Sequence, residues 1–193
     1  MDAMQNHLSL NRNETALVFR REPTLFSCNF SRSTRPKMDW LQERFALDRD
    51  QLRKLVKLRP SLLVYKMEDT LEPRLVWLRK RLEISEEALK HLVLGAPSIL
   101  SLTMKNVEPK LCFLQSQLGS SLTVDAIVHC PSLLACSLEV RLKPRIAEAR
   151  DNGVVLDVRC LGRIAKLTDD GWAASVGYQV RNMERENEIA ANW

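Results

Sequence analysis

Residues 60–74 read PSLLVYKMEDTLEPR, a segment that begins with one proline, carries a second near its end and closes on an arginine. The arrangement occurs four times along the 193 residues, at intervals of 34 to 37 residues. Self-similarity at this period is typical of a solenoid, in which each repeat buries its apolar face against its neighbours. The pairs account for all eight prolines: Pro23 and Pro36, Pro60 and Pro73, Pro97 and Pro109, Pro131 and Pro144.

The first proline of each pair marks the end of a predicted helix. Asn11, Asp48 and Ser85 lie twelve residues before the first three of these prolines, and all three are favoured N-cap residues. Glu14 and Gln51 follow at capping-box spacing. Because proline disfavours helix in the preceding residue, we expect helices of about ten residues here. After each proline come a small polar residue and a pair expected in the core: Leu25-Phe26, Leu62-Leu63, Ile99-Leu100 and Leu133-Leu134.

The second proline is predicted to lie in the first turn of a second helix, where its missing N–H costs little. Residues of capping type stand three positions ahead of it in three repeats, at Ser33, Thr70 and Asn106. The fold class is therefore all-α, an α-solenoid of about four helical repeats of 34–37 residues. One aromatic column of this helix is predicted to be inter-repeat core, with base stacking as the alternative: Trp40, Trp77 and Phe113.

Composition and charge limit the classes of function. The net charge is +5, with +7 in residues 1–150 and −2 in residues 151–193, which favours an anionic partner. No stretch approaches the roughly 20 apolar residues that a membrane helix needs. We expect no membrane association.

Cysteine, histidine and motif content argue against catalysis. The five cysteines show no C-x-x-C spacing, and three of them, Cys112, Cys130 and Cys136, are expected to pack as small apolar residues. The three histidines form no ligand pattern, and the chain lacks nucleophile, phosphate-loop, dinucleotide and zinc-protease motifs. We expect no enzyme, no metal, no cofactor and no small-molecule substrate.

One column of the repeat is basic in all four copies, directly after the second proline: Lys37, Arg74, Lys110 and Arg145. A cation in the first turn of a helix opposes the macrodipole, at a cost of roughly 0.3–1 kcal/mol when exposed. Contact with a phosphate would offset this cost, and a stem that covers the proline while the charge stays in water is the alternative. Under the phosphate hypothesis, replacing all four by Glu abolishes nucleic-acid binding and leaves helicity intact. A second cluster, Lys54, Lys57 and Arg59, suits a helix C-terminus and is predicted to be structural.

Residues 137–145, SLEVRLKPR, resemble the S-L-E-x-R-I-x-P-R motif of the mitochondrial transcription termination factor (mTERF) family. Residues 161–172, LGRIAKLTDDGW, resemble the segment that follows this motif, and the resemblance extends over roughly residues 11–175. It implies an α-solenoid that binds nucleic acid in mitochondria or chloroplasts and regulates transcription there, termination included. It also adds Arg141 and Lys143 to the expected nucleic-acid contacts.

On this basis the expected partner is double-stranded DNA, with RNA possible, and the expected state is a monomer. Three alternatives stay open: a protein-interaction solenoid, an RNA-binding factor in organelle RNA processing or ribosome assembly, and a reader of single-stranded RNA of the pentatricopeptide type. The expected division is an N-terminal extension (1–10), the repeat array (11–175) and a polar tail (176–193). The basic residues before residue 38 also suit an organelle-targeting segment, but residues 11–26 fit the repeat, so any cleavable presequence is expected to be short.

Overall fold

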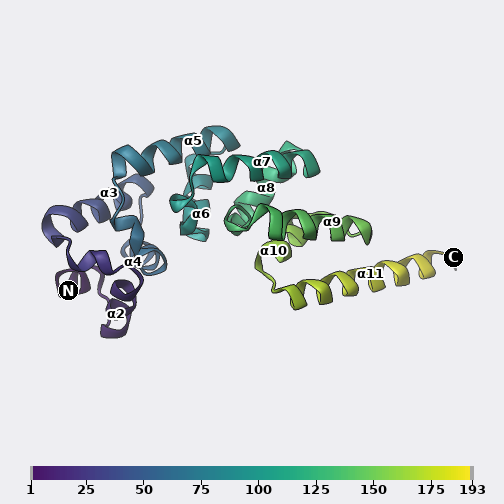
Figure 1. Ribbon diagram of the computed structural model, residues 1–193, viewed down its shortest axis with the longest axis horizontal. Coiled ribbons are helices and arrows are strands. Elements are labelled where there is room, and N and C mark those ends of the chain that lie inside the picture. The colour runs from purple at the N-terminus through teal and green to yellow at the C-terminus, as the bar shows by residue number, and fades with distance from the viewer. Residues whose placement is uncertain (1, 192–193) are drawn as a thin grey trace. The chain divides into compact units, whose positions relative to one another are not determined.

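The computed structural model describes residues 2–191, and side chains within residues 3–181; all regular elements in this part of the chain are helical (Figure 1). The helices of the first two repeats are α1 (Asp2–Leu8), α2 (Arg12–Arg21), α3 (Arg35–Phe45), α4 (Arg49–Leu58) and α5 (Glu72–Leu82). Those that follow are α6 (Glu86–Gly95), α7 (Met104–Leu118), α8 (Ser120–His129), α9 (Lys143–Asp151), α10 (Val158–Lys166) and α11 (Asp169–Ala191). The predicted all-α class is confirmed.

Short helical turns connect these helices. Four are 3₁₀ helices that begin at the first proline of each pair: η1 (Pro23–Phe26), η3 (Pro60–Leu63), η5 (Pro97–Ser101) and η6 (Pro131–Ala135). Three are π-helical turns that run directly into a second helix: η2 (Phe30–Thr34), η4 (Met67–Leu71) and η7 (Leu138–Leu142).

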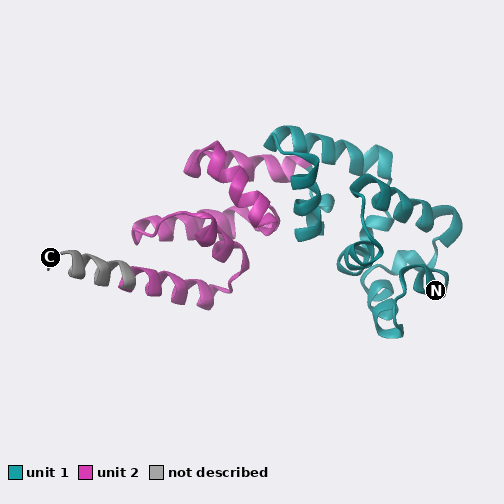
Figure 2. Cartoon of the chain, turned by 180° about the vertical axis from the view of Figure 1, so that it is seen from behind, with its two compact units in different colours: residues 1–103 teal, residues 104–193 magenta. Residues whose placement is uncertain are grey.

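The chain forms two compact units, residues 1–103 and 104–193 (Figure 2). In unit 1, α2 packs against α4 and η3, and α1 also contacts α4. In unit 2, α10 packs against α8, η6 and η7. In both units the first helix of one repeat thus stacks on the first helix of the next, as a repeat architecture requires.

The predicted starts of the first helices are confirmed. The side chain of Asn11 accepts a hydrogen bond from the Glu14 backbone at 2.8 Å, and Glu14 returns one to the Asn11 N–H at 3.0 Å. Asp48 and Gln51 form the same reciprocal pair. Each box satisfies two N–H groups that the first helical turn leaves without a partner.

The second proline lies in the first turn of α3, α5 and α9, as predicted, whereas Pro109 lies inside α7. The predicted caps are wrong, because Ser33 and Thr70 lie within π-helical turns and Asn106 lies inside α7. The π-helical turn ahead of α3 begins at Phe30 and is capped by Asn29, which accepts from the Arg32 N–H at 2.9 Å. A proline lacks an N–H and its ring clashes with the carbonyl four residues earlier, and the wider π turn just ahead of the proline accommodates both defects.

The residue pairs predicted to lie in the core are buried, with one exception. Leu63 and Leu134 are fully buried and Leu100 is 1% exposed, but Phe26 is 64% exposed, so its predicted core position is wrong. Cys130 and Cys136 are buried as predicted, whereas Cys112 is exposed. The predicted core aromatics are only half-buried: Trp40, Trp77 and Phe113.

The C-terminal repeat is more regular than its sequence indicates. Asp157 caps α10 by accepting from the Cys160 N–H at 2.7 Å, and Cys160, Leu161 and Ile164 are buried. Helix α10 thus corresponds to the first helix of a repeat, like α2, α4, α6 and α8, although no proline follows it. The boundary expected at residue 10 lies between α1 and α2, and the one expected at residue 175 lies within α11. The division into three parts stays a prediction.

Candidate nucleic-acid interface

The basic column that follows the second proline lies against the backbone of the next repeat. In unit 1, Lys37 on α3 donates from Nζ to the carbonyl oxygens of Leu63 at 2.7 Å and Val64 at 3.2 Å. Arg74 on α5 donates to the carbonyl of Leu100 at 3.0 Å and lies over the ring of Tyr65. Leu63 and Leu100 occupy the same position, the fourth residue of Pro-Ser-Leu-Leu in one repeat and of Pro-Ser-Ile-Leu in the next.

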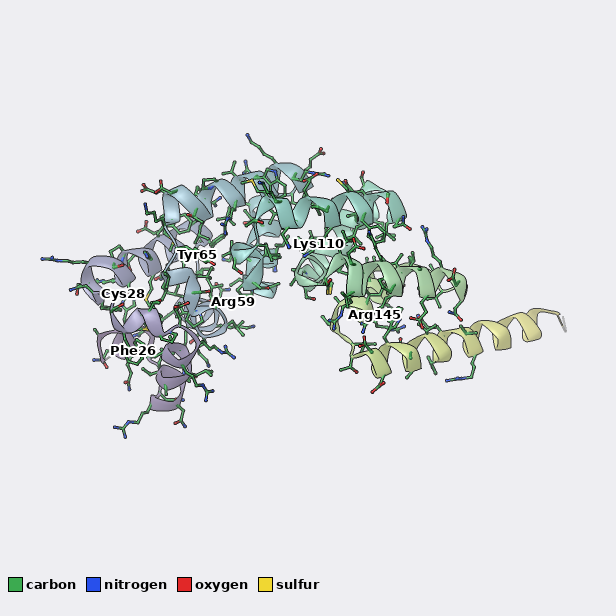
Figure 3. The ribbon with its side chains drawn as sticks, in the orientation of Figure 1. Phe26, Cys28, Arg59, Tyr65, Lys110 and Arg145 are labelled. Atoms are coloured by element: carbon green, nitrogen blue, oxygen red, sulfur yellow. The ribbon has the colours of Figure 1, made fainter. Side chains whose placement is uncertain are left out.

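Unit 2 repeats this contact with deeper burial, at Lys110 and Arg145, which are labelled in Figure 3. Lys110 on α7 donates to the carbonyl of Leu134 at 2.7 Å, and its side chain is buried, which lowers its pKa. Arg145 on α9 donates to the carbonyls of Ile164 at 2.8 Å and Leu167 at 2.9 Å, at the end of α10. Lys110 and Arg145 are only 5% and 4% exposed.

The two other residues of the predicted site also have partners. Arg141 donates to the carbonyl of Ala165 at 3.4 Å, so it joins Arg145 at the C-terminal end of α10. Lys143 pairs with Glu139 on the surface at 2.6 Å. Five of the six predicted residues therefore donate to backbone carbonyls of the following repeat, and their contact with phosphate stays a prediction.

A basic groove lies elsewhere, between α2 and α4. It has a volume of about 530 Å³, and cations outnumber acids among its lining residues: Glu14, Leu17, Arg21, Asp50, Arg53, Lys54, Lys57 and Leu58. We call this the α2–α4 groove. Helical spacing of three and four residues places Arg53, Lys54 and Lys57 on one side of α4. The sequence predicts a structural role for Lys54 and Lys57 at the end of this helix, because it does not show which residues of α2 face them.

Glu14 links the two helices that line this groove. Its carboxylate pairs with Lys57 and with Arg53 from the next repeat, each at 2.5 Å. The Lys57 ammonium, the Asn11 backbone N–H and the Arg53 guanidinium lower the pKa of Glu14 to about 2. Arg21 bridges the same helices by donating to the Lys57 carbonyl at 2.7 Å. Among the residues that the structure describes, Lys54 is an exposed cation of this groove without an ion-pair partner.

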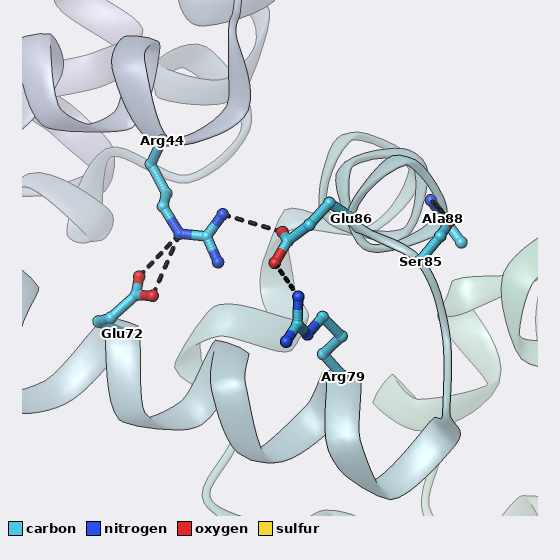
Figure 4. Close-up of polar contacts among 6 residues, drawn as sticks. All are labelled: Arg44, Glu72, Arg79, Ser85, Glu86 and Ala88. Carbon is cyan, nitrogen blue, oxygen red and sulfur yellow. Dashed lines mark hydrogen bonds and ion pairs between the residues drawn. The ribbon is translucent and has the colours of Figure 1, made fainter.

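A second contact between repeats, where the end of α3 meets the starts of α5 and α6, has a different balance of charge. Arg44 on α3 bridges Glu72 and Glu86, and Arg79 contacts Glu86 from the other side (Figure 4). The hydrogen bond from Arg44 lowers the pKa of Glu86. The adjoining pocket has a volume of about 210 Å³ and contains Glu43 and Glu87 as well. This inter-repeat network is nearly neutral, so it offers an anion little attraction.

Charge divides unevenly between the two compact units. Residues 1–103 contain 18 basic and 13 acidic side chains, a net charge of +5, whereas residues 104–193 contain 11 of each. The whole net charge of the chain thus belongs to unit 1, which holds the α2–α4 groove. Guanidinium and ammonium groups at one helical groove can neutralise phosphates without reading bases.

No three metal-ligating side chains cluster among the described residues. None of the helices in the described part of the chain has the length and apolar character needed to cross a bilayer.

Comparison with known proteins agrees with the helical repeat. The sequence profile of the mTERF family matches residues 3–166, which is most of the chain. No curated protein matches it. The family consists of helical-repeat proteins that bind nucleic acid, act in organelle gene expression and are not in general enzymes. The chain belongs to the mTERF family.

Proposed function

We propose that this chain binds double-stranded DNA and regulates transcription, termination included, in mitochondria or chloroplasts. It acts as a monomer without cofactor, metal or small-molecule substrate. The observation that carries the proposal is the α2–α4 groove, which presents four cations in the unit that holds all the net charge. Membership of a nucleic-acid-binding family supports it.

The cations of the α2–α4 groove bind the phosphates of the duplex. Arg21 and Lys54 line opposite sides of the groove, and Arg53 and Lys57 contribute the charge that Glu14 leaves uncompensated. Exposed Leu58, at 45%, gives the groove an apolar margin. Contacts of this kind fix the position of the protein on a duplex and make its affinity depend on salt.

Lys54→Glu tests the site, because Lys54 is exposed on α4 and its replacement removes no described ion pair. We expect weaker binding of a fluorescent duplex and a log–log salt dependence that is shallower by about one unit. The matched control is Lys166→Glu. Lys166 is an exposed cation on α10, in the unit whose net charge is zero, and its replacement should leave the binding constant and the slope unchanged.

Parallel titrations with single-stranded DNA and RNA of the same length distinguish the nucleic acids. Tighter binding of either than of the duplex would overturn the choice of double-stranded DNA. If Lys54→Glu and Lys166→Glu had equal effects, the α2–α4 groove would not be the site.

A further inference from the structure

We propose that the basic residue after each second proline is an inter-repeat clamp, a cation that holds the backbone of the following repeat in place rather than a phosphate ligand. The clamp residues are Lys37, Arg74, Lys110 and Arg145. Their stabilising role stands on the hydrogen bonds alone, and only their effect on DNA affinity rests on the proposed function.

The acceptor is the same atom in three successive repeats. Leu63, Leu100 and Leu134 are each the fourth residue of a 3₁₀ helix, close to its end, where the backbone supplies few donors for the last carbonyls. All three side chains are buried, and the hydrogen bonds to their carbonyls are partly buried at Leu63 and Leu100 and buried at Leu134. A long cationic side chain from the neighbouring repeat supplies the missing donor at 2.7 to 3.0 Å.

The charge of the acceptor supports this role. The carbonyl end of the neighbouring helical turn is a partial negative charge, and a hydrogen bond from a cation to it is favourable. The π-helical turns η2, η4 and η7 run directly into α3, α5 and α9, so Lys37, Arg74 and Arg145 lie beyond the first turn of their helical segments. The dipole cost expected from the sequence therefore does not arise at these three positions.

The last repeat provides an internal comparison. No 3₁₀ helix follows α10 in the described part of the chain, yet Arg145 donates to the carbonyls at the end of this helix, those of Ile164 and of the C-cap residue Leu167. The clamp follows the carbonyl end of the next helical segment rather than a particular sequence.

The clamp also positions the α2–α4 groove. Lys37 holds the end of η3, and η3 packs against α2, which forms one wall of the groove. Loss of this clamp should loosen η3 and lower DNA affinity indirectly, whereas the number of phosphate contacts should not change.

The test compares Lys37→Met, which keeps the aliphatic stem, with Lys37→Arg, which keeps a donor. Amide hydrogen exchange of residues 61–65 is measured by mass spectrometry. We expect exchange about tenfold faster in Lys37→Met, and a return towards wild type in Lys37→Arg. Lys66→Met is the control, because Lys66 is 80% exposed and pairs only with Asp69 in the described structure.

The salt dependence of duplex binding separates the clamp from a phosphate ligand. Lys37→Met should keep the wild-type log–log slope, whereas loss of a phosphate ligand would reduce it by about one unit. Unchanged exchange with a reduced slope would overturn the clamp. If the wild-type chain binds no nucleic acid, the proposed function fails. The amide hydrogen exchange of residues 61–65 still tests whether Lys37 stabilises the backbone of the following repeat. Lys110→Met and exchange of residues 132–136 repeat the test in unit 2.

Discussion

Replacing Arg145 by methionine removes a buried guanidinium and keeps most of its aliphatic stem. In the wild-type structure this group donates to the carbonyls of Ile164 and Leu167, pairs with Asp169 and lies over the ring of Trp172 with 5.6 Å to the centroid. Trp172 in turn donates from Nε1 to Glu148 at 2.7 Å. Arg145 therefore joins α9, α10 and the first turn of α11.

The expected cost follows from these contacts. The carbonyl of buried Ile164 loses a charged donor, which costs about 1–3 kcal/mol, and loss of the cation–π contact adds about 0.5–1 kcal/mol. The ion pair adds little, since the Asp169 side chain is 96% exposed. The more apolar methionine recovers part of the loss by packing. We expect Arg145→Met to lower the free energy of unfolding of unit 2 by about 2–3 kcal/mol.

Urea denaturation followed by tryptophan fluorescence measures this change, because Trp172 lies in the affected contact. Arg145→Lys should lose about half as much, since an ammonium still reaches one carbonyl. Asp169→Asn should cost less than about 0.5 kcal/mol. An Arg145→Met protein within 0.5 kcal/mol of wild type would refute the reasoning that these hydrogen bonds stabilise the repeat.

Three further predictions follow from the described contacts. Leu100→Ala should destabilise the protein by about 2–5 kcal/mol in urea denaturation, since Leu100 is 1% exposed; an unchanged midpoint would remove it from the core. The pKa of Glu14 is lowered to about 2 in the folded protein, so its stabilising effect is complete above the ordinary value of 4.5 and is lost as the pH falls towards 2. Glu14→Gln should therefore lower the urea midpoint at pH 7 and approach wild type at pH 2–3; a constant difference across this range would contradict the ion pairs. Asp48→Ala should cost about 0.5–2 kcal/mol through loss of the α4 capping box, with Asp48→Asn nearly neutral in the same assay.

Much of the fold could be predicted from local chemistry. The caps at Asn11, Asp48 and Ser85 depend only on hydrogen bonds within one helical turn, so the sequence contains all the information they need. The π turns ahead of Pro36, Pro73 and Pro144 could not be predicted in the same way. They result from a steric conflict that a helix can resolve by starting later or by widening one turn.

The candidate site was harder to predict for a different reason. Sequence shows where a cation is, but the acceptors of Lys37 and Lys110 are backbone carbonyls more than twenty residues away, and every residue has such a carbonyl. The α2–α4 groove depends on two helices from different repeats, with Glu14 facing Arg53 and Lys57. An alignment of the repeats shows each column separately and does not show which columns face each other.

Phosphate binding through the α2–α4 groove is the central functional claim, and the salt dependence of duplex binding by the wild-type chain tests it most directly. Each neutralised phosphate contributes about −0.9 to the slope of log K against log salt concentration. Arg21 and Lys54 alone should give a slope of about −2, and Arg53 and Lys57 should make it steeper. A linear fall at least this steep supports the account. Binding that is absent at low salt, or that does not change with salt, would contradict it and favour a protein-interaction solenoid.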